Sequence, residues 1–325
     1  MMRNFLLRVI GLAVLCAAAA CSVARPLDAP PGAGKILIDA DMGELNDDAQ
    51  ALFLLAAADV EILGLTTVGG NTWPEEGTAH ALRQLELIGR TSIPVVTGDT
   101  ARPVLRQGHR PDCRGALDRP RPSSHRSLPT PPYGGYAATE PAAGRASDFI
   151  ADQVRRHPRE VTFFMLGPAT NLARAVRDHP DIVPLIRAVV VLGDDAESEE
   201  FNRWFDPDAS RVVFDAPFPR RLVIPLEVAD PLVMDREGYE RVVAAGETPV
   251  TRLFTAVEGP RFAAESDHRV FVWDAVAAAV FLRPEIATDA DGLTVRAVDH
   301  DRFWDVYTEL LTRPDGLPVR SGQAR

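Results

Sequence analysis

The sequence predicts a single α/β domain built on an open, mostly parallel sheet with helices on both faces. Short apolar runs alternate with segments of helical periodicity, beginning with strands at 36–38 and 60–67 and a helix at 74–88. This rhythm favours right-handed crossovers between parallel strands. About 300 residues follow a short leader without a change in composition, which is enough for one large domain spanning 35–325.

The first 21 residues have the layout of a signal peptide. Two arginines precede the apolar stretch Val9–Ala20, which is short for a bilayer span and ends at Cys21. This ending resembles a lipobox, in which the cysteine becomes the lipidated first residue; an ordinary cleaved signal is the alternative. Residues 22–34 contain several prolines and predict a flexible tether. We therefore expect an exported protein of the cell envelope or periplasm, contacting a membrane only through a lipid anchor at Cys21.

The remaining elements follow in the order that such a sheet requires. Apolar runs predict further strands at 94–97, 161–166, 187–192, 221–226 and 293–298. Helical patterns are expected after the first strand and at 147–156, 170 onwards, 208–214, within 235–265, 273–282 and 303–311.

The segment 101–145 interrupts this rhythm. It contains eight prolines and shows little periodicity. A segment of this length inside a domain is usually a functional loop or a surface insertion. A lid over the carboxyl ends of the strands and a mobile surface insertion are both open interpretations.

Composition excludes several classes of partner and site. The formal net charge is −11, which argues against binding to a nucleic acid polymer and leaves small neutral or cationic ligands. Cys113 is the only cysteine beyond the leader, so neither a disulfide framework nor a cysteine metal site is available. No G-x-G-x-x-G sequence follows the first strand, which argues against a dinucleotide site.

Four aspartates follow the first predicted strand and form the most informative feature of the sequence. Asp39 and Asp41 end the strand, and Asp47 and Asp48 begin the next helix, with Gly43 between the two pairs. Carboxylates packed this closely repel one another unless a cation lies among them. A hard divalent cation with oxygen ligands is the natural candidate.

Further polar residues follow the later strands, where ligands of open parallel sheets bind. They are amides, carboxylates, a hydroxyl and an indole: Asn71, Thr170, Asn171, Asp194, Asp195, Glu200, Asn202, Trp273 and Asp274. A single Asp or Asn after a strand is more often a helix cap than a ligand. As a group they suit a hard metal and a polyhydroxylated ligand such as a sugar.

Several of these segments resemble one enzyme family, the inosine/uridine-type nucleoside hydrolases (nucleoside N-ribohydrolases). The resemblance extends from residue 35 to the C-terminus and rests on Asp39–Gly43 with Asp47–Ala49, Thr66–Asn71, Leu166–Ala173, Glu200–Asn202 with Asp206–Ala209, and Trp273–Asp274. It implies an open Rossmann-like α/β fold with Ca²⁺ at the strand ends. It also implies that the ion and an aspartate activate water to release the base from a ribonucleoside.

The resemblance implies a role for each matching residue. Asp41, Asp48, Asp274 and the Leu166 carbonyl would bind Ca²⁺, and Asp41 would also act as the general base. The ribose would be bound by Asp47, Asn71, Glu200, Asn202 and, through the ion, Asp274.

Trp273 bears on the choice of base. One branch of the family has a histidine at this position as the leaving-group acid, whereas tryptophan resembles the purine-preferring branch, in which an indole stacks on the base. We therefore expect purine nucleosides to be favoured, with Trp73 as a second stacking face. The alternative for Trp273 is a core aromatic residue at the start of an apolar helix.

Two features depart from the family pattern and keep other functions open. The insertion Glu44–Asn46 lengthens the aspartate turn, and the loop at 193–199 lacks the asparagine that contacts the ribose 5′-hydroxyl. A non-catalytic riboside-binding lipoprotein is one alternative. A metal-dependent phosphatase is another, although Gly43 and the lack of any lysine after Lys35 argue against it. The expected partner is a small-molecule nucleoside, and a homo-oligomer is left open.

Overall fold

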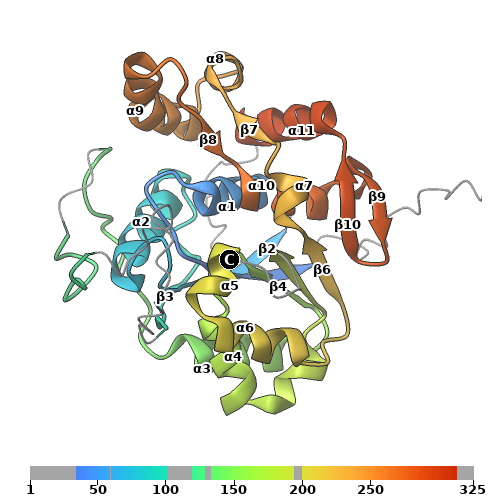
Figure 1. Ribbon diagram of the computed structural model, residues 1–325. Coiled ribbons are helices and arrows are strands. Elements are labelled where there is room, and N and C mark those ends of the chain that lie inside the picture. The colour runs from blue at the N-terminus through green and yellow to red at the C-terminus, as the bar shows by residue number, and fades with distance from the viewer. Residues whose placement is uncertain (1–33, 59, 102–118, 129–132, 194–199, 313–325) are drawn as a thin grey trace, which may run out of the picture.

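An eight-stranded sheet forms the centre of the protein in its computed structural model (Figure 1). The structure describes residues 34–58, 60–101, 119–128, 133–193 and 200–312. The strand order is β3-β2-β1-β4-β5-β6-β10-β9, and all neighbours are parallel except β10 and β9. The strands are β1 (Lys35–Ala40), β2 (Glu61–Thr67), β3 (Val95–Thr97), β4 (Val161–Met165), β5 (Ala188–Leu192), β6 (Arg221–Ile224), β9 (Ala287–Asp291) and β10 (Thr294–Val298).

Helices cover both faces of the sheet because its central strands are apolar on both sides. In β1, Ile36 and Ile38 point into one core cluster and Leu37 into the other. The smaller cluster lies against α3 (Ala146–Arg156), α4 (Thr170–Asp178) and α6 (Pro207–Asp215). The larger one lies against α1 (Asp47–Ala57), α2 (Pro74–Leu87), α7 (Leu226–Ala229), α8 (Arg236–Ala244), α9 (Pro249–Ala264), α10 (Trp273–Leu282) and α11 (His300–Thr312).

The predicted fold class is confirmed, and the predicted strands and long helices form close to their expected bounds. Several short or polar elements were not predicted from the sequence. They are the antiparallel edge strand β9, the two-residue strands β7 (Val233–Met234) and β8 (Val270–Phe271), the short helices α5 (Phe201–Phe205) and α7, and the 3₁₀ turns at Pro180–Leu185 and Pro284–Ile286.

Part of the predicted insert is described, and it lies against the start of α2. Arg119 and Arg121 form ion pairs of 2.9 Å with Glu76 and Glu75, and the Trp73 indole donates a hydrogen bond to the Arg119 carbonyl. Whether the insert acts as a lid stays a prediction. The leader, Cys21 and Cys113 lie outside the described residues. Among the described helices, none is long and apolar enough to cross a membrane.

Candidate active site

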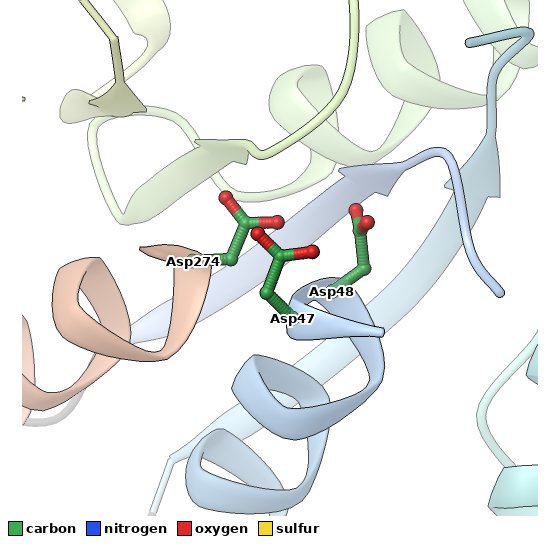
Figure 2. A group of neighbouring side chains, drawn as sticks. All are labelled: Asp47, Asp48 and Asp274. Atoms are coloured by element: carbon green, nitrogen blue, oxygen red, sulfur yellow. The ribbon is translucent and has the colours of Figure 1, made fainter. Parts of the chain in front are cut away.

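The turn between β1 and α1 lies at the carboxyl edge of the sheet, next to the start of α10. Parallel strands place their carboxyl ends at one edge, so the chain segments after β1, β2, β4 and β5 meet there. Helix α1 begins at Asp47 and is capped by Asn46, whose side-chain oxygen accepts a hydrogen bond from the Ala49 amide. Because α10 packs beside α1, Asp274 in its first turn faces Asp47 and Asp48 (Figure 2).

Three carboxylates converge at this point. One oxygen each from Asp47, Asp48 and Asp274 lies within 4.8 Å of the other two. Asp48 and Asp274 are almost wholly buried, at 1% and 2% exposure. The predicted insertion Glu44–Asn46 therefore leaves Asp47 and Asp48 close to Asp274.

Asp41 lies beside this cluster and is linked to it and to Asn71 by hydrogen bonds. Its Oδ2 accepts a 2.6 Å hydrogen bond from the Asn71 amide, and its own amide donates to Asp48 Oδ1 at 3.2 Å. Two glycines permit this close packing. A Cβ at Gly70 would lie 2.2 Å from Asp41 Oδ2, and one at Gly167 would lie 2.9 Å from the Asp41 amide nitrogen. Any larger residue at either position would displace Asp41.

Asp39 lies within β1, two residues before Asp41, and its side chain joins the strand ends. Its Oδ1 accepts hydrogen bonds from Thr66 Oγ1 at 2.5 Å and Asn171 Nδ2 at 2.7 Å. Asn171 also donates to the Thr67 carbonyl, so a single amide joins the ends of β1 and β2 to the start of α4. Burial raises the pKa of Asp39 to about 7.

The electrostatics of the cluster indicate a cation site. Burial raises the pKa of Asp41 to about 7 and that of Asp47 to about 6. Burial, together with repulsion from the neighbouring aspartates, raises the pKa values of Asp48 and Asp274 well above their usual range.

The carboxylate oxygens of the cluster fit a hard metal ion. Asp274 Oδ1 is buried and has no hydrogen-bond partner in the part of the chain that the structure describes. An orphaned carboxylate oxygen facing two other carboxylates is costly without a cation. The candidate ligand atoms of the three aspartates are carboxylate oxygens, which Mg²⁺ and Ca²⁺ prefer.

The loop after β4 and the helix α5 form the side of the site opposite α1. Asn202 Nδ2 donates a 2.7 Å hydrogen bond to the Leu166 carbonyl, the predicted fourth ligand. Glu200 caps α5 by accepting hydrogen bonds from the Asn202 and Arg203 amides. The Glu200 carboxylate is close enough to Asp41 and Asp274 to raise their pKa values. Asp194 and Asp195 lie outside the described residues.

The two predicted stacking residues, Trp273 and Trp73, lie in different surroundings. The Trp273 ring stacks on Phe271 with centroids 4.4 Å apart, and its indole N–H is buried with no hydrogen-bond partner among the described residues. Phe271 is 46% exposed, although large apolar side chains are usually buried. Trp73 caps the start of α2, and Arg121 lies over its ring at 5.6 Å.

The structure thus brings together the predicted residues Asp41, Asp47, Asp48, Asn71, Leu166, Glu200, Asn202, Trp273 and Asp274. The closest carboxylate triple contains Asp47, whereas the sequence interpretation placed Asp41 among the ligands and Asp47 at the ribose; those roles stay predictions. Asn46, Gly70, Gly167 and Phe271 were not predicted as site residues. The Gly-rich turn before Asn71 was a signal for Gly70, but the contacts of the other three depend on the folded chain.

Comparison with known proteins agrees with this geometry. The family described as inosine-uridine preferring nucleoside hydrolase matches residues 36–309. The pyrimidine-specific ribonucleoside hydrolase RihA of Salmonella paratyphi B is 32% identical over 194 residues, which cover 57% of this chain and 58% of that enzyme.

Solved structures share the fold. A plant nucleoside hydrolase, PpNRh1, superimposes with a TM-score of 0.68 at 21% identity, over 87% of this chain and all of that one. A purine-preferring ribonucleoside hydrolase from Gardnerella vaginalis has a TM-score of 0.64 at 20% identity, over 85% and 98% of the two chains. The family match covers most of the chain and includes the carboxylate cluster, so this protein belongs to the inosine-uridine preferring nucleoside hydrolases, enzymes that hydrolyse N-glycosyl compounds.

Proposed function

We propose that this enzyme hydrolyses the N-glycosidic bond of ribonucleosides with the help of a bound Ca²⁺ ion and favours purine nucleosides. The observation that carries the proposal is the convergence of Asp47, Asp48 and Asp274 beside Asp41 at the carboxyl edge of the sheet (Figure 2). A cluster of oxygen ligands supports Ca²⁺, which accepts six to eight oxygens and so leaves positions for water and sugar hydroxyls.

The proposed ligands are Asp48, Asp274 and the Leu166 carbonyl, with Asp41 or Asp47 completing the carboxylate set. When bound, the ion would lower the pKa of a coordinated water and orient the ribose hydroxyls. Asn202 donates to the Leu166 carbonyl, which has a second lone pair for this role. Asn202 on α5 and Glu200, the N-cap of α5, are the proposed ribose-binding groups of this segment.

Asp41 is the proposed general base. In the metal-free protein, burial raises its pKa to about 7. A bound cation would lower this pKa and keep the carboxylate ionised, which is the form that accepts a proton. The Asn71 amide fixes one of its carboxylate oxygens, so the side chain is oriented before substrate binds. The proton of the attacking water passes to Asp41, and the water oxygen forms the new bond to C1′. The bond between C1′ and the base breaks with its electron pair leaving on the base, which takes up a proton from solvent to become the free base.

The base preference rests on Trp273. The exposed Phe271 ring stacks on the partly buried Trp273 indole. The two rings form an aromatic surface at the start of α10, next to Asp274 in the sequence. Stacking energy grows with ring area, which favours purines. The relatives are named for both preferences, pyrimidine-specific for RihA and purine-preferring for the G. vaginalis enzyme, so the preference needs a direct test.

The test is a panel of inosine, guanosine, adenosine, uridine and cytidine incubated with the purified protein, with free base and reducing sugar measured for each. We expect equal amounts of base and ribose, and faster release from the purine ribosides. No release from any riboside, combined with measurable riboside binding, would replace the proposal with a non-catalytic binding protein.

We also propose that the protein is exported and anchored to a membrane through Cys21, on the basis of its leader sequence. Cell fractionation should find the protein with membranes, and the Cys21→Ser variant in the soluble fraction. A soluble wild-type protein would contradict the anchor.

A further inference from the structure

Asn46 lies in the turn between β1 and α1, and its side chain contacts three backbone groups and the Asp48 carboxylate. Its Oδ1 accepts hydrogen bonds from the Gly43 amide at 2.9 Å and the Ala49 amide at 3.3 Å. Its Nδ2 donates to Asp48 Oδ2 at 2.7 Å and lies 3.4 Å from the Asp41 carbonyl. The oxygen therefore caps α1, while the nitrogen contacts the carboxylate cluster.

Both oxygens of Asp48 are fixed as a result. Oδ2 accepts from Asn46, and Oδ1 accepts from the Asp41 amide at 3.2 Å. Two donors on separate oxygens define the plane of a carboxylate and favour its ionised form, which is the form that binds a cation. Asp274 contrasts with this arrangement, because its Oδ1 has no hydrogen-bond partner among the described residues.

The chemistry of the amide explains the choice of residue. Serine and aspartate cap helices about as well as asparagine does. Other capping side chains in the described chain, such as those of Asp235 on α8 and Glu200 on α5, satisfy amides of their helices as acceptors. An ionised aspartate at 46 would cap α1 but could not donate to Asp48. Asparagine can do both at once.

Neighbouring elements hold the turn in place from outside. Gln84 on α2 is buried and its Nε2 donates to the Gly43 and Glu44 carbonyls at 2.8 and 2.9 Å. Thr72 Oγ1 donates to the Met42 carbonyl at 2.8 Å. The backbone around Asn46 is therefore fixed independently of Asn46, so its side chain can be changed without loss of the whole turn.

We propose that Asn46 is a positioning residue that orients Asp48 as a cation ligand in the lengthened turn. This inference rests on the proposed Ca²⁺ site and concerns how this chain builds it. Donors that hold a metal-ligating side chain usually contribute 10- to 100-fold to metal affinity, which is about the effect we expect.

The test compares Asn46→Ser with Asp235→Ala, which removes a cap on a helix away from the cluster. Calcium affinity is measured by calorimetry on protein stripped with EGTA, and the melting temperature is measured in EGTA. Asn46→Ser keeps a capping oxygen but lacks the amide nitrogen that reaches Asp48 Oδ2, and its hydroxyl stands one bond nearer the backbone. Its Kd should therefore rise about 10- to 100-fold with little change in melting temperature. Asp235→Ala should lower the melting temperature by about 2–4 °C and leave the Kd unchanged.

Asn46→Gly provides a second variant, because glycine is also accepted at helix N-caps, and it should weaken Ca²⁺ binding in the same way. In an Asp48→Asn background, Asn46→Ser should change the Kd by less than about twofold, because its effect acts through Asp48. Wild-type affinity in both Asn46 variants would overturn this inference and leave the metal site intact. A wild-type protein that binds no Ca²⁺ would overturn both.

Discussion

The two sides of the candidate site are held by different forces. On the carboxylate side, Asp41 and Asp48 are fixed by hydrogen bonds from backbone amides and from Asn46. On the aromatic side, Trp273 is held by packing and by its stack on Phe271, and its buried indole N–H finds no partner among the described residues. Hydrogen bonds therefore set the orientation of the carboxylates, whereas packing holds the Trp273 ring in place.

This difference suggests a division of roles. Hydrogen-bonded carboxylates give the precise geometry that water activation requires. A stacked aromatic surface tolerates different bases, because every base has a flat face. We therefore expect the carboxylate side to determine whether the reaction occurs, and the aromatic side to determine which base leaves fastest.

The largest expected effect comes from the carboxylate side. Asp41→Asn should lower kcat for inosine by about 10²- to 10⁴-fold, because the amide cannot accept the proton. Circular dichroism should show an unchanged fold. Asp289→Asn, at an exposed position on the edge strand β9, provides the matched control and should retain full activity. Activity close to wild type in Asp41→Asn would remove the general-base assignment.

An intermediate effect is expected on the aromatic side. Trp273→Ala should lower kcat/KM for inosine by about 5- to 150-fold, which corresponds to about 1–3 kcal/mol of lost stacking. The loss for uridine should be smaller, because its ring is smaller. Steady-state kinetics with both ribosides, in Trp273→Ala and in the comparison variant Trp73→Ala, will check this. Equal losses for the two ribosides in Trp273→Ala would mean that Trp273 does not select the base.

The smallest expected effect concerns stability and pH. The pKa values of Asp41 and Asp47 rise to about 7 and about 6 in the folded protein, above the value of about 4 in an unfolded chain. Between these values the folded state holds protons that the unfolded state has released. The unfolding free energy of the metal-free protein should therefore fall as pH rises from about 4 to about 7.

Melting temperatures in EGTA at about pH 5 and about pH 8 will measure this loss. Excess Ca²⁺ should restore stability at the higher pH, because the ion binds the deprotonated cluster in the folded state. A metal-free melting temperature that rises across this pH range would show that burial does not raise the pKa values of these two carboxylates.

Much of the fold could be predicted because the central strands carry strong local signals. Strands β1, β4 and β5 are apolar on both faces, which marks them as interior parallel strands. Strand β9, with the sequence Ala-Thr-Asp-Ala-Asp, is mostly exposed and owes its form to pairing with β10. Pairing of this kind has no local signature, and neither do strands as short as β7 and β8.

The site was predictable to a similar degree. The four aspartates and Asp274 stand out because charge at the ends of apolar segments is unusual. The contribution of Asn46 could not be predicted, since an asparagine before two aspartates is typical of an ordinary helix cap. Its contact with Asp48 depends on a turn whose conformation is set by Gln84 and Thr72, from a different part of the chain.

The calcium requirement of hydrolysis tests the central claim most directly. Protein stripped with EGTA should release no hypoxanthine from inosine, and stepwise addition of Ca²⁺ should restore the rate to a plateau that Mg²⁺ does not reach. The half-maximal Ca²⁺ concentration should agree with the Kd from calorimetry. Full activity in excess EGTA would contradict the assignment of the Asp47, Asp48 and Asp274 cluster as a catalytic metal site.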